Sequence, residues 1–274
     1  MQKKLAIIGI GNMAKAIVGG VVHSNIPISE IIVYDKNPSQ YDSLPKELFE
    51  FSYASCVSEA IQHADCVLIA VKPQNYSNVL EEMKTVSDHA SKLYVSIGAG
   101  ITMESVSKRL SGARVVRVLP NLPMVIGQGV SLVCRNPQIL PADFEFVCDV
   151  FRSAGNVLVI AESEMNRMIG VTSSSPAYVF QFIDSIYQGA LAQGLSDHDL
   201  LNAICDVVIG SAHLLKQSCE SPKELIARVA SKGGTTEKAL EKLCEYRLED
   251  TIREAMKACT DRAIEVGAAQ QDKK

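Results

Sequence analysis

Residues 3–20, KKLAIIGIGNMAKAIVGG, decide the fold of this chain. The apolar run at 5–8 predicts a short buried strand, and the spacing of apolar residues over 14–23 predicts a helix. A G-x-G-x-x-A turn lies between them and consists of Gly9, Ile10, Gly11, Asn12, Met13 and Ala14. The first glycine permits the turn, the second lets a phosphate approach the backbone, and the small last residue lets helix and strand pack closely. The stretch therefore predicts a dinucleotide-binding loop at the start of the first helix.

Residues 1–161 alternate strand-like and helical segments. The expected strands are 5–8, 30–34, 66–70, 93–96, 115–119, 129–133 and 157–160. The expected helices between them are 14–23, 57–63, 76–86 and 103–110. Several strands are unbroken runs of Val, Ile and Leu, which is typical of strands buried on both faces. This alternation predicts an α/β fold with a Rossmann-type, mostly parallel sheet.

From residue 162 the strand pattern stops and helical spacing takes over. The expected helices are 176–193, a second one that Ser196 caps, 236–245 and 248–266. Four large side chains make these helices apolar on more than one face: Phe180, Phe182, Ile209 and Leu214. An isolated small domain should not expose so much apolar surface. We therefore expect two domains, a Rossmann domain over 1–161 and an all-α dimerisation domain over 162–274.

The composition is that of an ordinary globular protein, since 47% of the 274 residues are hydrophobic and 21% are charged. A net charge of −4 without a basic cluster argues against nucleic-acid binding. No apolar run approaches the roughly 20 residues that span a membrane. The short run after Lys3 and Lys4 fits a first strand better than a signal peptide. The eight cysteines form no C-x-x-C pair, so we expect no metal site and a reducing, cytoplasmic setting.

The choice of coenzyme depends on three residues after the second strand, Asp35, Lys36 and Asn37. A carboxylate at this place accepts a hydrogen bond from a ribose 2′-hydroxyl and favours NAD. Lys36 and Asn37 follow directly, however, and can hold the 2′-phosphate of NADP. All three can also be ordinary turn residues. The sequence therefore predicts NADPH or NADH and leaves the choice open.

Four further segments follow the glycine loop in a fixed order: Ala70-Val71-Lys72-Pro73-Gln74, Arg117-Val118-Leu119-Pro120-Asn121-Leu122-Pro123, Ser174-Ser175-Pro176-Ala177-Tyr178 and Ser231-Lys232-Gly233-Gly234-Thr235-Thr236. Together with the loop they resemble, across nearly the whole chain, the pyrroline-5-carboxylate reductase family. The resemblance implies NAD(P)H-dependent reduction of 1-pyrroline-5-carboxylate to L-proline, the last step of proline biosynthesis. It also implies a Rossmann domain and a helical domain that interlocks as a homodimer, often within a decamer.

The resemblance implies coenzyme contacts at the end of one strand. Ala70, Val71, Lys72 and Pro73 are expected on the ribose and nicotinamide side, because ligands of open α/β sheets bind at the carboxyl ends of strands. For Lys72 a positioning or packing role is the better interpretation than proton donation. Asn121 either contacts the nicotinamide carboxamide or stabilises its own turn. Arg117 is expected to form a structural ion pair.

The segment Ser231-Lys232-Gly233-Gly234-Thr235-Thr236 carries the substrate hypothesis. Two glycines before two threonines predict a loop that leads into a helix, where backbone N–H groups and hydroxyls face an anion. By resemblance Ser231, Gly233, Gly234, Thr235 and Thr236 hold the substrate carboxylate, and the Thr236 hydroxyl lies near the ring nitrogen as the catalytic group. An ordinary capped helix start is the alternative. Ser174 and Tyr178 either line the same pocket or begin a packed helix.

Several positions depart from the family pattern. Ser173 and Ser175 stand where glycines are common, which reduces backbone freedom. Lys232 stands in place of Pro and adds a cation beside the expected carboxylate site, and Val57 replaces a polar residue. These departures affect the choice of substrate and coenzyme more than the type of reaction.

Two other functions remain open from the sequence. One is a related imine or β-hydroxyacid reductase with another substrate. Dehydrogenases of that group place a catalytic Lys four residues before an Asn on the first interdomain helix, and the segment 165–170 offers Asn166 without such a Lys. The other is a regulator that binds NAD(P) without catalysis. Turnover of an imine separates an enzyme from a regulator.

Overall fold

The computed structural model describes residues 2–195 and 199–271. Contacts within the chain group Met1–Ser174 with Lys257–Lys274 into one unit, and Ser175–Met256 into a second. Each unit is described by itself. The domain division that we expect between residues 161 and 162 stays a prediction.

Within the described residues, the first unit is built on an eight-stranded sheet with the order β3-β2-β1-β4-β5-β6-β7-β8. The strands are β1 (Lys3–Ile8), β2 (Ile28–Tyr34), β3 (Phe51–Tyr53), β4 (Cys66–Ile69), β5 (Leu93–Ser96), β6 (Arg114–Leu119), β7 (Gly129–Arg135) and β8 (Gly155–Val159). Strands β1 to β6 are mutually parallel, whereas β7 runs antiparallel to β6 and parallel to β8. The prediction of a Rossmann-type, mostly parallel sheet is therefore confirmed.

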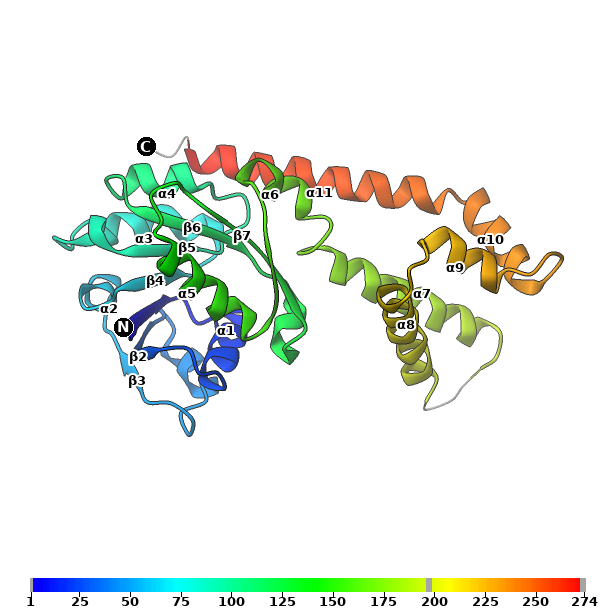
Figure 1. Ribbon diagram of the computed structural model, residues 1–274, viewed down its shortest axis with the longest axis horizontal. Helices are drawn as coiled ribbons and strands as arrows, with labels where there is room; N and C mark the ends of the chain where they lie inside the picture. Colours follow the sequence, from blue (N-terminus) through cyan, green and yellow to red (C-terminus); the bar gives the residue numbers. More distant parts are fainter. Residues whose placement is uncertain (1, 196–198, 272–274) are drawn as a thin grey trace. The chain divides into compact units, whose positions relative to one another are not determined.

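A hydrophobic core lies on each face of this sheet. Helices cover both cores (Figure 1). Helices α1 (Asn12–Val22) and α5 (Pro141–Arg152) pack on one face. The other face is covered by α2 (Val57–Gln62), α3 (Tyr76–Met83), α4 (Met103–Arg109) and α6 (Glu162–Met168). The strands between these layers are buried on both faces, as their unbroken apolar runs predict. Strand β3, which is only three residues long, and helix α5 are not predicted by the sequence patterns.

The end of the last helix, α11 (Leu248–Gln271), belongs to the first unit. Ala263 is buried in the same core as Met165 of α6. Gly100 permits a close approach here, since a Cβ at its position would lie 2.8 Å from the Ala263 carbonyl oxygen. The Ser174 hydroxyl and the Cys259 thiol lie 3.0 Å apart, where the chain leaves and re-enters the unit.

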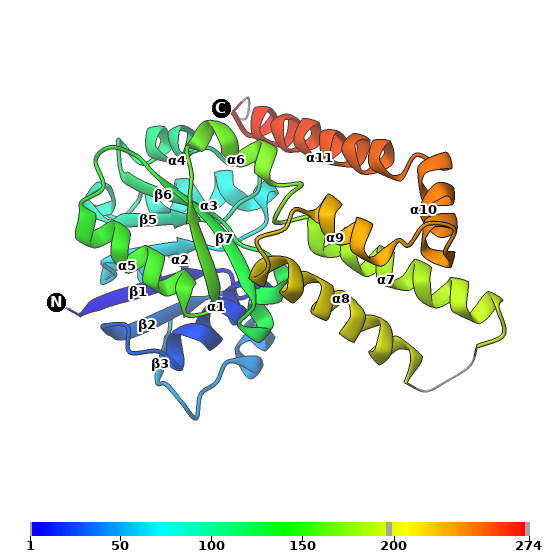
Figure 2. The ribbon, with the colours of Figure 1, turned by 45° about the vertical axis from the view of Figure 1, so that its right-hand side comes forward.

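The second unit is entirely helical within its described residues. Its helices are α7 (Ser175–Ala192), α8 (Leu200–Gln217), α9 (Pro222–Val229), α10 (Thr235–Glu245) and the first part of α11. Helix α7 lies beside α8 (Figure 2). The prediction of helices after residue 162 is confirmed, although α9 was not foreseen. Ser196, the expected cap of the second helix, lies outside the described residues.

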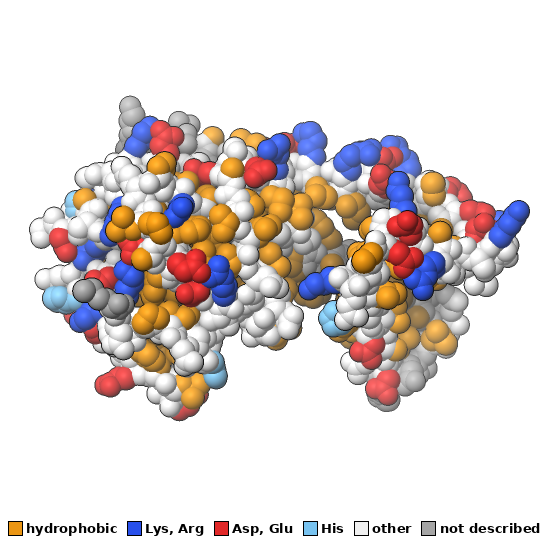
Figure 3. Space-filling view, viewed as in Figure 1, with side chains coloured by type: hydrophobic (Ala, Val, Ile, Leu, Met, Phe, Trp, Pro, Cys, Tyr) orange, Lys and Arg blue, Asp and Glu red, His pale blue; other side chains and the backbone are white. Residues whose placement is uncertain are grey.

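The helices of the second unit expose large apolar side chains (Figure 3). Phe180, Phe182, Ile209 and Leu214 are each about half exposed in the single chain. Of the residues of α7 and α8 that are described, Ile204 is the buried one. So much apolar surface on neighbouring helices marks a protein–protein interface. No helix in the described part of the chain is long and apolar enough to cross a membrane.

Candidate functional site

The glycine loop, residues 9–14, joins β1 to α1 as predicted. Gly9 has φ +94°, and a Cβ at this position would lie 2.9 Å from the carbonyl oxygen of Ala70, which directly follows β4. Glycine is therefore required at residue 9 for both conformation and packing. A Cβ on Gly11, in contrast, would meet no protein atom within 4 Å. Residue 11 faces open space, and a ligand can approach its backbone.

Helix α1 begins without a side-chain cap. Its N-cap is Gly11, which offers no side chain to the first N–H groups, and its first turn carries no acidic residue. Helix α4, in contrast, is capped by the Thr102 hydroxyl, which accepts a hydrogen bond from the Ser105 N–H. The unfilled N–H groups and the helix dipole together make the start of α1 suited to a phosphate.

A groove lies at the carboxyl ends of β1 and β4, where the strand order reverses. Such a reversal is the usual ligand site of an open α/β sheet. The cavity measures about 610 Å³, within the range of small-molecule sites. Eight of the predicted coenzyme residues line it: Gly9, Gly11, Asn12, Asp35, Lys36, Ala70, Val71 and Lys72.

The Asp35 carboxylate is held by backbone N–H groups. Its Oδ2 accepts a hydrogen bond from Ile10 at 2.7 Å, and its Oδ1 accepts one from Asn37 at 2.9 Å. The Tyr41 hydroxyl fixes the same residue by accepting from the Asp35 N–H and donating to the Asp35 carbonyl. Lys36 is exposed, and no ion pair to it occurs within the described residues. Asp35 therefore braces the glycine loop, and Lys36 places a cation at the rim of the groove.

Other predicted coenzyme residues do not line this groove. Ile10 and Ala14 are fully buried and pack in the core beneath the loop, with Met13 beside them. Asn37 accepts hydrogen bonds from Ser39 and begins a short 3₁₀ turn. Pro73 begins another such turn after β4. These residues shape the loops, and direct contact with a coenzyme stays a prediction for them.

Asn121 and Arg117 tie strand β6 to the segment that leads to α7. Asn121 is buried, its Oδ1 accepts from the Val130 N–H at 2.8 Å, and its Nδ2 donates to the Thr172 carbonyl at 3.1 Å. The Asn121 side chain therefore joins the end of β6 to β7 and to the segment before α7, whereas contact with nicotinamide stays a prediction. Arg117 is 1% exposed and donates to Glu162 at 3.4 Å and to Asn166 at 2.9 Å. Its predicted ion pair is confirmed.

The groove is also lined by side chains for which the sequence predicts no coenzyme contact: Tyr34, Gln40, Gln74, Asn75 and Val79. Gln74 is the last residue of the quoted segment after β4 and Asn75 directly follows it, so their position along the chain was an available signal. Tyr34 ends β2, and burial, followed by the nearby Glu82 carboxylate, raises the pKa of its phenol above the ordinary value. The phenol is therefore neutral at physiological pH.

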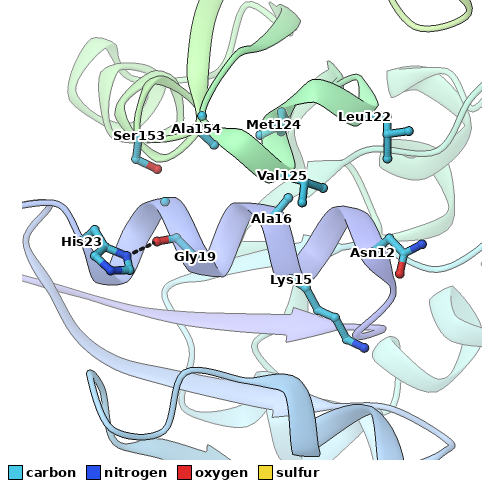
Figure 4. Close-up of a pocket in the computed structure, with 12 residues that line it drawn as sticks. Asn12, Lys15, Ala16, Gly19, His23, Leu122, Met124, Val125, Ser153 and Ala154 are labelled. Carbon is cyan, nitrogen blue, oxygen red and sulfur yellow. Dashed lines mark hydrogen bonds between the residues drawn. The ribbon is translucent and has the colours of Figure 1, made fainter. Parts of the chain in front are cut away.

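A second cavity of about 690 Å³ runs along the outer side of α1. Figure 4 shows Asn12 and Lys15 on α1, with Leu122, Met124 and Val125 of the 3₁₀ turn Leu122–Ile126 opposite. Asn12 lines both cavities. Within the described residues, no cluster of three or more His, Cys, Asp or Glu side chains could hold a metal ion.

The predicted substrate residues lie in the second unit and form the 231–236 loop, which consists of residues 231–234 between α9 and α10 together with Thr235 and Thr236, the first two residues of α10. Gly233 has φ +73°, a conformation that favours glycine. The Gly234 N–H donates to the Ser231 carbonyl at 2.9 Å, and a Cβ on Gly234 would lie 2.6 Å from Ser231 Oγ. Both glycines are therefore needed for this turn.

Helix α10, like α1, begins at a glycine N-cap without a side-chain hydrogen bond. The hydroxyls of Thr235 and Thr236 make no hydrogen bond with any described residue. Thr236 is half-buried and Thr235 is exposed. First-turn N–H groups and two adjacent hydroxyls can together bind a carboxylate.

Comparisons with known proteins agree with this arrangement. Residues 162–266 match the family described as pyrroline-5-carboxylate reductase dimerisation, and residues 4–100 match the one described as NADP oxidoreductase coenzyme F420-dependent. The pyrroline-5-carboxylate reductase of Escherichia coli is 35% identical over 265 residues, covering 96% of this chain and 98% of the relative. That of Vibrio alginolyticus is 34% identical, covering 97% and 98%.

Solved structures of similar proteins share the whole fold. The pyrroline carboxylate reductase of Plasmodium falciparum, solved with NADP bound, has a TM-score of 0.85 at 26% identity and covers 97% of this chain and 98% of its own. The 1-pyrroline-5-carboxylate reductase of Streptococcus pyogenes has a TM-score of 0.87 at 27% identity, covering 96% and 99%.

Fold and site together define a Rossmann-type oxidoreductase that uses a nicotinamide dinucleotide and carries a helical dimerisation region. The prediction of NADPH or NADH as coenzyme is thereby confirmed. Within that class, the chain belongs to the pyrroline-5-carboxylate reductase family.

Proposed function

We propose that this protein reduces 1-pyrroline-5-carboxylate to L-proline with NADPH or NADH, the last step of proline biosynthesis. The observation that supports it most is that two helices, α1 and α10, begin at glycines and leave their first N–H groups without a side-chain cap. Helix α1 offers an anion site to the coenzyme, and α10 offers one to the substrate carboxylate. The comparisons give no support to a reductase of another substrate or to a non-catalytic regulator.

The residues around the glycine loop fit a dinucleotide. A Cβ at residue 11 would occupy space that the protein leaves open, so the backbone there can approach a pyrophosphate. Gly9, Gly11 and the first N–H groups of α1 would hold that pyrophosphate. Ala70, Val71 and Lys72 line the same groove on the side of β4. When bound, the reduced nicotinamide supplies a hydride.

The residues of the 231–236 loop bind and orient the substrate in this proposal. Thr235 and Thr236 hold the ring carboxylate, and the Thr236 hydroxyl lies near the ring nitrogen. The ring arrives protonated as an iminium, so the hydride adds to C5, the C=N π electrons become the nitrogen lone pair, and the nitrogen keeps its proton. No separate acid is then required. The protein contributes orientation and exclusion of water, which lower the entropic part of the barrier.

The proposal requires the glycine loop and the 231–236 loop to meet in the working enzyme, within one chain or across a dimer. The apolar faces of α7 and α8 support a homodimer. A decamer and a cytoplasmic location complete the proposal, and sedimentation of the purified protein tests the size of the assembly.

Turnover with two imines tests the function. NADPH oxidation is followed with 1-pyrroline-5-carboxylate and with 1-pyrroline, which lacks the carboxylate. We expect rapid, imine-dependent oxidation with the first and a kcat/KM about 100-fold lower with the second, since charge-assisted hydrogen bonds to the carboxylate are lost. Thr236→Ala should lower kcat/KM for the first imine and leave coenzyme affinity unchanged. Coenzyme binding without imine-dependent oxidation would refute the proposal.

A further inference from the structure

We propose that Glu237 is a positioning residue that fixes the 231–236 loop in its substrate-binding form. The Glu237 Oε2 accepts a hydrogen bond from the Gly233 N–H at 2.7 Å, across the turn that precedes α10. Glu237 is half-buried on the first turn of this helix. The inference rests on the proposed function, because it concerns the loop that is assigned there to the substrate carboxylate.

The start of the neighbouring helix α9 differs from the start of α10, because α9 has a side-chain cap. There Ser221 caps the helix, and Glu224 accepts from both the N–H and the hydroxyl of Ser221 at 2.6 and 2.7 Å. The Ser221 hydroxyl in turn accepts from the Glu224 N–H at 3.4 Å, so the start of α9 is closed by its own side chains.

Helix α10 has the glutamate of such a capping box, Glu237, but no hydroxyl side chain at its N-cap. Its N-cap is Gly234, and the Gly234 N–H is already bonded to the Ser231 carbonyl. Glu237 therefore reaches one residue further back, to Gly233. The amides of both glycines are satisfied within the loop, while no N-cap side chain fills the first-turn N–H groups of α10. Glu237 thus holds the loop without closing the anion site.

The loop needs such a bond because of its sequence. Two adjacent glycines have high conformational freedom, and Gly233 must stay at φ +73° for the turn to persist. A charge-assisted hydrogen bond to its N–H restricts that freedom. An unrestrained loop has to be ordered when the substrate binds, which weakens binding.

The negative charge of Glu237 works against binding of the substrate, although its hydrogen bond holds the loop. A carboxylate at the start of α10 repels an anionic substrate, so the benefit of Glu237 must come from its hydrogen-bond acceptor and not from its charge. Lys232, exposed on the same loop, offsets part of this charge, and no ion pair to it occurs among the residues described. Substitutions of Glu237 can separate the effect of its hydrogen-bond acceptor from the effect of its negative charge.

Three variants test the inference. Glu237→Ala removes both acceptor and charge, and Glu237→Gln keeps an acceptor oxygen without the charge. Glu241→Ala is the matched control, since Glu241 lies on the next turn of α10 and pairs with the exposed Lys238. Steady-state kinetics with 1-pyrroline-5-carboxylate and NADPH are compared, together with Tm.

We expect Glu237→Ala to raise the KM for the imine about ten-fold, as for the loss of one charge-assisted hydrogen bond. The KM for NADPH and Tm should stay at wild-type values. Glu237→Gln should have an imine KM equal to or below that of wild type, and Glu241→Ala should match wild type. An unchanged imine KM in Glu237→Ala, or an equal rise in Glu237→Gln, overturns the inference.

Hydrogen exchange of peptides that cover residues 231–240 gives a readout that is independent of catalysis. Exchange should be faster in Glu237→Ala and unchanged in Glu237→Gln and Glu241→Ala. Equal exchange in all four proteins would also overturn the inference. If the wild-type protein fails to turn over the imine, the proposed function fails, and the exchange experiment still decides whether Glu237 fixes the loop.

Discussion

The Asp35 carboxylate accepts a hydrogen bond from the Ile10 N–H at 2.7 Å, which joins the end of β2 to the glycine loop after β1. The other carboxylate oxygen accepts from the Asn37 N–H. From sequence, Asp35 was a candidate for contact with a ribose hydroxyl. In the structure it braces the loop that would hold the pyrophosphate, a part that NADH and NADPH share.

Asp35→Ala should therefore weaken the binding of both coenzymes to the same extent. We expect the Kd for NADH and for NADPH each to rise about ten-fold, because one charge-assisted bond to the loop is lost. Asp35→Asn, which keeps one acceptor oxygen, should lie between this variant and wild type. Titration calorimetry measures both constants. A loss confined to NADH would mean that Asp35 acts on the ribose instead.

Lys36 should distinguish the two coenzymes. It lies at the rim of the groove, next to the expected position of the adenosine ribose. Lys36→Ala should raise the Kd for NADPH about five-fold, the size of one exposed charge pair, and leave that for NADH unchanged. The effect should shrink at high salt. Lys46→Ala, at an exposed lysine paired with Asp42, is the control. Equal changes for both coenzymes would count against a phosphate contact.

Substitution of the two glycines of the loop, Gly9 and Gly11, should have different effects on stability and coenzyme binding. Gly9→Ala puts a Cβ 2.9 Å from a backbone oxygen at positive φ, so we expect a loss of about 2 kcal/mol or more in unfolding free energy. Gly11→Ala meets no protein atom, so its Tm should stay near that of wild type while coenzyme binding is lost. Thermal melts with and without NADPH separate the two effects. Strong coenzyme stabilisation of Gly11→Ala would contradict the assignment of the pyrophosphate site.

The Asp143 carboxylate should make the free energy of unfolding depend on pH in the acidic range. Burial opposes its charged form, but bonds with Lys3 at 2.7 Å and Arg114 at 2.5 Å outweigh burial and hold the pKa of the Asp143 carboxyl below its ordinary value. The folded protein thus binds this proton less tightly than the unfolded chain. The stabilisation is therefore present above the unfolded pKa of about 3.9 and is lost as pH falls through the lower folded pKa.

Asp143→Asn should accordingly cost about 3 kcal/mol at pH 7, where it leaves two cations without their partner. The difference from wild type should narrow as the pH falls below about 4. Denaturant unfolding at several pH values measures it. A difference that stays constant across that range would show that the ion pairs are not its source.

Local sequence patterns predicted the elements that hold the loops. The β1 strand, the glycine turn and α1 lie within one short stretch of sequence. The two adjacent glycines, residues 233 and 234, likewise predict their turn from the local sequence alone. A strand as short as β3 carries too few residues to show a pattern. Side-chain partners were beyond reach, because Asp35 bonds to a residue 25 positions away and Asn121 to one 51 positions away. Such pairs arise only when the sheet is assembled.

Transfer of deuterium tests the central claim most directly. NADPH that carries deuterium at C4 is incubated with the purified protein and 1-pyrroline-5-carboxylate, and the product is analysed by mass spectrometry. With one of the two C4 stereoisomers, we expect L-proline that is heavier by one deuterium, located at C5. If neither stereoisomer yields labelled proline, hydride transfer to the ring C=N does not occur and the account is wrong.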